Sequence, residues 1–153
     1  MLQLTKRTEY GLLALVLMAD REGRTVSVRE ICERYPLPKR TVAEVLKDLQ
    51  RSSLVSSQRG STGGYTLARE PDRITVGQVV AALEGAPALT SCESPLVLRN
   101  GGCEVQPICP IRSPIQRVRD RLWQMLEHTT LKSLQSQGSS SPTALSNAAM
   151  PSR

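Results

Sequence analysis

The chain has 153 residues, of which 39% are hydrophobic and only 3% aromatic, with no phenylalanine. A chain of this length can bury an aliphatic core of its own, so neither disulfides nor a metal are required merely for folding. The 20 Lys and Arg residues exceed the 14 Asp and Glu residues and leave a net charge of +6. This surplus favours a polyanionic partner but carries no information about the fold.

The apolar run Gly11–Ala19 follows Lys6 and Arg7, as in the first two regions of a secretory signal. Charged residues 20–22 come directly after it, without a small-residue cleavage site, and the run is too short to span a bilayer. We expect instead a central helix, apolar on nearly all sides including that of Leu13, in a cytoplasmic protein without a membrane partner. In that compartment the four cysteines are more typical of metal or redox chemistry than of structural disulfides.

Two helix starts follow. Ser27 and Glu30 have the spacing of a capping box, which predicts a short helix that Pro36 ends. Pro38 suits the first turn of a third helix. The inner stripe of that helix comprises Val42, Val45, Leu46 and Leu49.

The pattern then changes to that of a hairpin. Residues 55–59 and 65–67 are predicted strands, and the glycine-rich segment 60–64 between them is typical of a turn. A second capping box at Thr75–Gln78 predicts a helix that continues through Leu83.

Half of the ten prolines and three of the four cysteines lie between Pro87 and Pro114, which excludes a regular element there and suggests a functional loop. Ser113 and Gln116 form another capping box, with Pro114 expected at the first helical position. The helix that follows has a narrow apolar stripe, typical of helix pairing, and we expect its partner to be the same helix of a second subunit. The stripe comprises Ile115, Val118, Leu122 and Met125.

Four segments result. Residues 1–85 form a DNA-binding domain, 86–113 a cysteine-containing loop, and 114–135 a dimerisation helix with a short C-terminal helix. Residues 136–153 are rich in serine and lack acidic residues, so we expect a disordered tail. The fold class is mainly α with a small β-wing, namely a winged helix-turn-helix plus a long dimerisation helix.

The third helix can enter the major groove of DNA with charged residues at its leading end. Lys39 is expected to contact phosphate, whereas Arg40 and Thr41 can reach base edges. Glu44 can accept from a cytosine amine or exclude other bases. The alternative is an ordinary solvated, charged helix beside a surface hairpin. The order of helices and hairpin, together with the net charge, favours DNA binding.

The hairpin would act as the wing. Its glycines allow the backbone to approach DNA closely, and Arg59 can reach a narrow minor groove. Ser61, at the tip of the same turn, is the other wing residue expected to contact DNA.

Six short segments, taken together, are characteristic of one protein family: Leu4-Thr5-Lys6, Tyr10-Gly11-Leu12, Leu54-Val55-Ser56-Ser57, Arg59-Gly60, Gly63-Gly64-Tyr65 and Ile74-Thr75-Val76-Gly77. Through them and the cysteine loop, the chain resembles the IscR/NsrR family of bacterial transcription regulators over about residues 2–135. The resemblance implies a homodimeric winged-helix regulator that reads a palindromic or near-palindromic duplex, and many members carry an iron–sulfur cluster in the loop before the dimerisation helix. No small-molecule substrate is implied.

Cys92, Cys103 and Cys109 are too widely and irregularly spaced for a structural zinc site, and the only histidine, His128, lies well beyond them. Iron–sulfur clusters accept thiolates from such loops, and a reversible disulfide between two of these cysteines is the other possibility. The resemblance favours the cluster, with a two-iron form (2Fe–2S) slightly preferred over a four-iron form (4Fe–4S). Cys32 is interpreted as a small residue of the core.

A fourth cluster ligand is needed. Some members of the family have a histidine three residues after the third cysteine, but this chain has Arg112 there, which cannot ligate iron. In other members an acidic residue near the start of the first helix, contributed by the other subunit, completes the site, and Glu9 stands at the matching position. The other interpretation of Glu9 is an acidic residue favoured by the dipole of its helix.

We therefore predict a DNA-binding regulator controlled by a cluster that senses iron–sulfur status, redox state or nitric oxide. The alternatives are a cluster-free regulator switched by thiol oxidation and, more remotely, an iron–sulfur scaffold or interaction protein that does not bind DNA. An enzyme with a nucleophilic cysteine is disfavoured, because nothing places His128 near the three loop cysteines as a general base.

Overall fold

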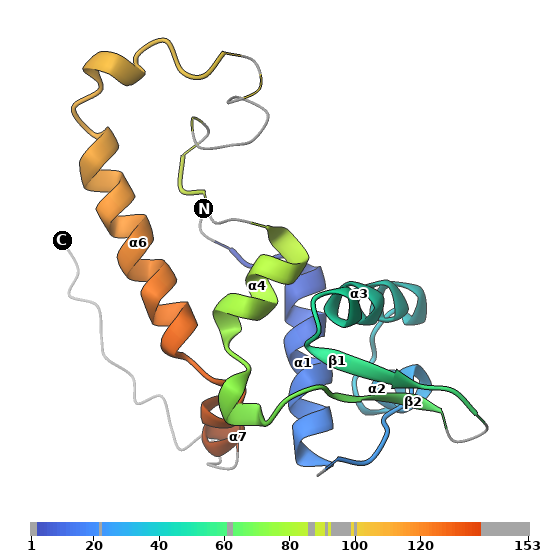
Figure 1. Ribbon diagram of the computed structural model, residues 1–153. Coiled ribbons are helices and arrows are strands. Elements are labelled where there is room, and N and C mark those ends of the chain that lie inside the picture. Colours follow the sequence, from blue (N-terminus) through green and yellow to red (C-terminus); the bar gives the residue numbers. More distant parts are fainter. Residues whose placement is uncertain are drawn as a thin grey trace, which may run out of the picture.

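The computed structural model describes residues 3–21, 23–60, 63–85, 88–90, 92, 99 and 101–138. Within these residues, no helix combines the length and apolar character needed to cross a bilayer. Figure 1 shows α1 at the centre, with α3 and a two-stranded wing on one side and the long α6 on the other. The helices and strands are α1 (Lys6–Asp20), α2 (Val28–Arg34), α3 (Lys39–Arg51), β1 (Val55–Gln58), β2 (Gly64–Leu67), α4 (Val76–Glu84), α6 (Arg112–His128) and α7 (Leu131–Gly138), with 3-10 turns η1 (Pro71–Arg73) and η3 (Gln106–Ile108).

The first helix is central, as its apolar sequence predicts. Thr5 caps α1 by accepting a hydrogen bond from the Thr8 amide at 3.3 Å. The helix packs against α3, α4, α7 and β2. Leu13 is 36% exposed, although α1 is central. The elements that surround α1 leave the side of Leu13 partly open.

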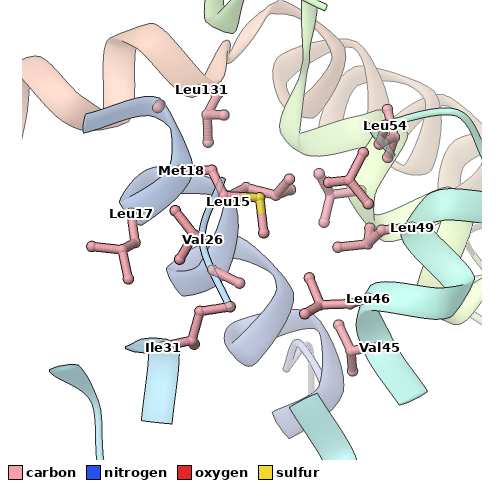
Figure 2. Packing of buried hydrophobic residues seen from close by; sticks show 14 of the residues in the cluster. Leu15, Leu17, Met18, Val26, Ile31, Val45, Leu46, Leu49, Leu54 and Leu131 are labelled. Carbon is pink, nitrogen blue, oxygen red and sulfur yellow. The ribbon is translucent and has the colours of Figure 1, made fainter. Parts of the chain in front are cut away.

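The core is aliphatic and lies where α1 meets α2, α3 and α7 (Figure 2). Leu15 and Met18 of α1 are fully buried, and so is the whole predicted inner stripe of α3. Cys32 packs against this core and is half-buried, as expected. The remaining labelled core residues in Figure 2 are Leu17, Val26, Ile31, Leu54 and Leu131.

The starts of α2 and α3 differ in detail from the sequence prediction. The Ser27 hydroxyl accepts from the Glu30 amide at 3.1 Å, but the Glu30 carboxylate pairs with Arg21 at 3.1 Å instead of closing the capping box. Pro38 is the N-cap of α3 and not a first-turn residue, because its backbone is extended, with ψ at 115°. The helix therefore begins at Lys39, and Lys39, Arg40 and Glu44 are exposed in its first turns.

The wing is an antiparallel hairpin in which Val55 pairs with Leu67 and Gln58 with Gly64. Val26 extends this sheet, because it exchanges backbone hydrogen bonds of 2.8 and 2.9 Å with Tyr65. Gly64 is required at this junction, since a Cβ there would lie 2.6 Å from the Val26 carbonyl oxygen. The predicted hairpin is thus confirmed, and it is fixed to the segment that precedes α2.

A short extended pairing anchors α6 to the domain. The Val76 amide donates to the Thr129 carbonyl and the Leu131 amide to the Ile74 carbonyl, both at 2.8 Å. Both halves of the predicted Thr75–Gln78 capping box are present. Gly77 permits the close approach of α4 to α6, because a Cβ there would meet the backbone of Glu127 at 3.1–3.2 Å.

The helix expected to mediate dimerisation, α6, begins at Arg112 with Ile111 as its N-cap, so the predicted Ser113–Gln116 capping box does not form. Pro114 lies in the first turn but not at its first position, which is tolerated because amides in this turn have no partner within the helix. The C-terminal helix α7 continues through Gly138, and so residues 136–138, expected in the tail, are helical. Residues 139–153 lie outside the described part of the chain.

No residue of α6 is buried, although the helix is 17 residues long. Ile115 and Leu122 of the predicted stripe are half-buried, whereas Val118 and Met125 are 54% and 64% exposed. Figure 1 shows that α6 rises away from the body of the domain and carries the cysteine segment at its far end. The apolar stripe is therefore left largely uncovered in the protomer.

Candidate nucleic-acid interface and cysteine segment

The N-terminal end of α3 presents polar and charged side chains to solvent. Lys39 and Arg40 are exposed, Thr41 is half-buried, and Glu44 is exposed. The Arg40 side chain is 93% exposed and its Nε lies 3.1 Å from Glu44 Oε1. The structure therefore brings Arg40 and Glu44, which the sequence predicts to read bases, into one ion pair.

The wing extends from the C-terminal end of α3. The Gln50 side-chain amide donates to the Ser57 hydroxyl at 2.9 Å, which ties the end of α3 to β1. Arg59 is exposed just beyond β1, and the Gly63 amide closes the turn onto the Gly60 carbonyl at 3.0 Å. Ser61, the other expected wing contact, lies outside the described residues.

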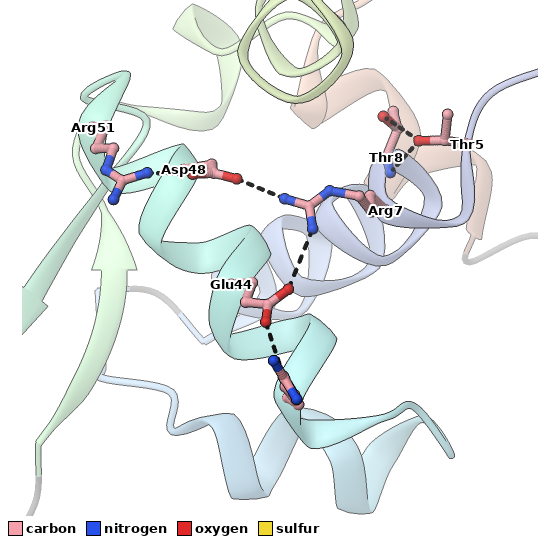
Figure 3. Close-up of polar contacts among 7 residues, drawn as sticks. Thr5, Arg7, Thr8, Glu44, Asp48 and Arg51 are labelled. Atoms are coloured by element: carbon pink, nitrogen blue, oxygen red, sulfur yellow. Dashed lines mark hydrogen bonds and ion pairs between the residues drawn. The ribbon is translucent and has the colours of Figure 1, made fainter.

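A charged network joins α1 to α3 (Figure 3). Arg7 Nη2 lies 2.6 Å from Asp48 Oδ2, and Arg7 Nη1 lies 3.5 Å from Glu44 Oε2. Asp48 is also held by Arg51 at 2.8 Å, and Glu44 by Arg40. The carboxylates of Glu44 and Asp48 are one helical turn apart, so the Arg7 guanidinium relieves their mutual repulsion.

No sequence motif identifies Arg7, Asp48 and Glu84, which the fold brings to the first turn of α1 or to its contact with α3. Lys6 and Arg7 stand in that turn, where a cation opposes the helix dipole and is favoured only if an acidic partner is near. Lys6 pairs with Glu9 of the same helix, with Nζ 2.6 Å from Oε2, and this contact raises the pKa of Lys6. The unfavourable placement of two cations at a helix start is a sequence signal, although it does not identify their partners.

Glu84, the last residue of α4, reaches the start of α1. Its Oε1 accepts from the Thr5 backbone amide at 2.8 Å. Partial burial raises the pKa of Glu84, but hydrogen bonds from the Thr8 side chain and from Thr5 outweigh it and bring the pKa below the ordinary value. A carboxylate is unfavourable at the C-terminal end of its own helix and favourable at the N-terminal end of another, which explains this cross-helix contact.

The three loop cysteines are half-buried, and none of the four cysteines forms a disulfide. Cys92 Sγ lies 3.0 Å from the Thr90 hydroxyl. Cys103 follows Gly101-Gly102, whose positive φ angles of 93° and 82° turn the chain. Cys109 follows the 3-10 turn η3 and precedes α6 by three residues.

The donor chemistry of this segment fits an iron–sulfur cluster, since three unbridged thiols lie on a loop that glycines and prolines keep irregular. Within the described residues of one protomer, however, no group of three or more Cys, His, Asp or Glu side chains is gathered to hold a metal. Glu9 instead pairs with Lys6, and its side chain is 37% exposed. The single chain thus supplies the donors but does not assemble them.

Trp123 and His128 lie on α6. Trp123 is half-buried. His128 is exposed at the end of the helix, and its Nδ1 lies 2.6 Å from the Gln124 carbonyl oxygen.

A helix-turn-helix followed by a hairpin, with basic residues at the start of the third helix, defines a winged-helix DNA-binding protein. A family model described as Rrf2, iron-dependent transcriptional regulator, matches residues 4–137. The chain therefore belongs to the Rrf2 family of transcriptional regulators.

Solved structures agree with this assignment. CymR, the global cysteine regulator of B. subtilis, is 29% identical with a TM-score of 0.69, over 90% of this chain and 98% of that one. T. potens IscR is 27% identical with a TM-score of 0.68, over 95% and 94%. The oxidized form of Staphylococcus aureus CymR is 25% identical with a TM-score of 0.64, over 88% and 96%. The mainly helical winged-helix fold predicted from the sequence is confirmed.

The hydrogen bonds to Glu84 predict a pH-dependent contribution to stability. Because its folded-state pKa is lowered, the contribution is complete above the ordinary value of 4.5 and is lost as the pH falls through the folded value. Glu84→Gln should lower the free energy of unfolding, measured by urea titration at neutral pH, by less than about 1 kcal/mol, since the site is largely solvated. The difference from wild type should shrink as the pH falls through that folded-state value, because both proteins then carry a neutral side chain. A difference that does not change with pH would contradict this account.

Proposed function

We propose that this Rrf2 regulator binds duplex DNA as a homodimer, with α3 of each protomer in a major groove and the wing beside it. The observation that carries this proposal is the exposed basic start of α3, next to an exposed Arg59 on the wing. Lys39 would contact phosphate, Arg40, Thr41 and Glu44 base edges, and Arg59 and Ser61 the neighbouring minor groove. The ion pair between Arg40 and Glu44 would break when Arg40 forms hydrogen bonds with a base.

The uncovered stripe of α6 supports the homodimer. Ile115, Val118, Leu122 and Met125 alternate at spacings of three and four residues, which is the pattern of an antiparallel or parallel helix pair. The half-exposed Val118 and Met125 leave apolar surface that a second α6 would cover. Two α3 helices would then reach half-sites one or more helical turns apart.

We further propose that an iron–sulfur cluster controls DNA binding. Cys92, Cys103 and Cys109 would hold it, with Glu9 of the other subunit as the fourth ligand and a two-iron form slightly preferred. When bound, such a cluster supplies a redox-sensitive and oxidant-labile group, suited to sensing iron–sulfur status, redox state or nitric oxide. Ligation by Glu9 requires its carboxylate to leave Lys6, so the 2.6 Å ion pair competes with assembly of the site.

The cluster-free alternative is a regulator switched by thiol oxidation. Two observations favour it: the cysteines are unbridged and half-buried in the structure, and a homologous CymR has been crystallised in an oxidized form. In this alternative an oxidant would join two of the three loop cysteines in a disulfide before the N-terminal end of α6, while the DNA-binding residues keep the same roles. An iron–sulfur scaffold that does not bind DNA remains the more remote alternative.

DNA binding is tested by titrating a duplex long enough for two half-sites at several salt concentrations. Lys39→Ala should weaken binding and reduce the salt slope by about 1 for each lost phosphate contact, whereas Arg40→Ala should cost about 1–3 kcal/mol at a specific site. Lys132→Ala, an exposed lysine on α7, is the matched control and should bind as wild type. Salt-independent or absent duplex binding by the wild type would instead favour the scaffold.

The dimer is tested by placing charges on the α6 stripe. Val118→Glu combined with Met125→Glu should give a monomer in sedimentation velocity, because two carboxylates in the helix pair would be desolvated and would repel those of the partner. The helix content should be unchanged, since both side chains are exposed in the protomer. Arg117→Glu places the same charge on α6 away from the stripe and should remain dimeric. A dimeric double variant would place the interface elsewhere.

The cluster is tested by the visible spectrum of protein purified without oxygen, with iron and sulfide assayed on the same sample. Brown protein with matched iron and sulfide is expected, and serine at Cys92, Cys103 or Cys109 should abolish the colour, whereas the core variant Cys32→Ser should retain it. Glu9→Ala should be paler or bleach faster. If the wild type is colourless and cannot be reconstituted, the cluster is excluded and thiol oxidation becomes the proposed control of DNA binding.

A further inference from the structure

The first turn of α1 touches two elements that are distant from each other in the sequence. On one side the Thr5 amide donates to Glu84, where α4 ends and the chain enters the segment that carries Cys92. On the other side Arg7, only two residues later, pairs with Asp48 and Glu44 of α3. The partners are far apart in the sequence: Thr5 and Glu84 by 79 positions, and Arg7 from Asp48 by 41 and from Glu44 by 37.

We propose that Glu84 and Arg7 are positioning residues that join the entrance of the cysteine segment to the DNA-reading helix α3 through the first turn of α1. This inference rests on the proposed function, because it assigns the path by which the state of the cysteine segment reaches DNA. Neither residue belongs to the proposed thiol ligands or to the residues proposed to contact bases.

The geometry makes this turn rigid. Thr5 and Thr8 hold each other through the helix cap, and both donate to the Glu84 carboxylate. Gly85 follows with φ at 87°, so the chain turns sharply immediately after the anchored carboxylate. A displacement of the cysteine segment therefore pulls on Glu84 and, through it, on the end of α1.

Arg7 transmits this displacement to α3. Glu44 is shared by Arg7 and Arg40, at 3.5 and 3.1 Å. If Arg7 withdraws, Glu44 and Asp48 repel each other and Glu44 turns to Arg40 alone, which holds Arg40 back from DNA. If Arg7 stays, Glu44 is partly neutralised and Arg40 is released more easily. The position of Arg7 thus sets how readily α3 reads a base.

The first experiment measures the ratio of duplex dissociation constants between protein reconstituted with iron and sulfide and reduced, cluster-free protein. If the wild-type ratio falls in the usual allosteric range of about 5 to 150, Glu84→Ala should bring it to within about two-fold of one. Its visible spectrum and dimeric state should be unchanged. Glu84→Gln keeps an oxygen acceptor for Thr5 and should retain most of the ratio, and Glu70→Ala, an exposed glutamate in the turn after the wing, should keep all of it.

The second experiment uses cluster-free protein only. Duplex affinities of wild type, Glu84→Ala, Arg7→Gln and the double variant form a cycle. Because the two residues do not touch, independent effects should multiply within about two-fold. We expect the affinity of the double variant to deviate by more than this from the product of the two single effects. Removing Glu84 already loosens the turn that positions Arg7, so the Arg7 substitution then has a smaller effect. The circular dichroism spectra of all four proteins verify that they are folded.

Each outcome decides the inference. A wild type that switches while Glu84→Ala switches equally well overturns the inference and leaves the proposed function intact. If the duplex affinity of the wild type changes with neither the cluster nor thiol oxidation, the proposed control is overturned. The four-protein cycle then decides the inference. Multiplicative effects overturn the link between Glu84 and Arg7, and non-multiplicative effects support it as a structural coupling onto α3.

Discussion

The rest of the structure depends on the burial of α1. Its side chains are aliphatic on most of its circumference, so the helix can be stable in water only if several other elements cover it. The third helix covers one side through its buried valine and leucine stripe, α4 and α7 cover others, and β2 contacts it as well. This one requirement fixes α3 relative to the wing and places both on the side of α1 away from α6 (Figure 1). Because a chain without phenylalanine fills the core with small branched side chains, the packing is built from many close contacts between helices, not from a few large rings.

Charge complements this packing at the two ends of the central helix. Arg7 opposes the dipole of α1, and Glu84 opposes that of α4, yet each has a partner on another helix: Arg7 pairs with Asp48 of α3, and Glu84 accepts from the Thr5 amide at the start of α1. The result is that charges unfavourable within their own helices become the contacts that register one helix against another. At the opposite end, Gln135 of α7 donates to Asp20 at 2.7 Å and ties the last described helix to the end of α1. The basic start of α3 is thereby mounted on the same helix whose first turn contacts the end of α4.

Much of the fold could be predicted from local patterns. The inner stripe of α3, the glycine-tipped hairpin and the Thr75–Gln78 capping box depend on residues close together in the sequence, and all three are found. Predictions that depended on the choice between local and distant partners were less accurate. Glu30 satisfies Arg21 and leaves its capping box incomplete, and α6 starts before the serine that would have capped it. For the candidate site, the basic start of α3 was evident, whereas its ion pairs with α1 were not, because no periodicity reports a contact between residues 41 positions apart.

The sequence by itself determined the class of protein: a winged helix with a basic reading helix, followed by an irregular cysteine segment and an amphipathic helix with an apolar stripe. Hydrophobic period, capping residues and glycine placement are sufficient for this, since they act over one or two turns of chain. Only the tertiary structure decided how the charges of these elements are shared. It showed that Glu44 lies between Arg40 and Arg7, that Glu84 reaches the cap of α1, and that the described part of one protomer does not gather three metal-binding side chains. Such contacts depend on the angles and distances at which packed helices meet, and these are set by the whole core.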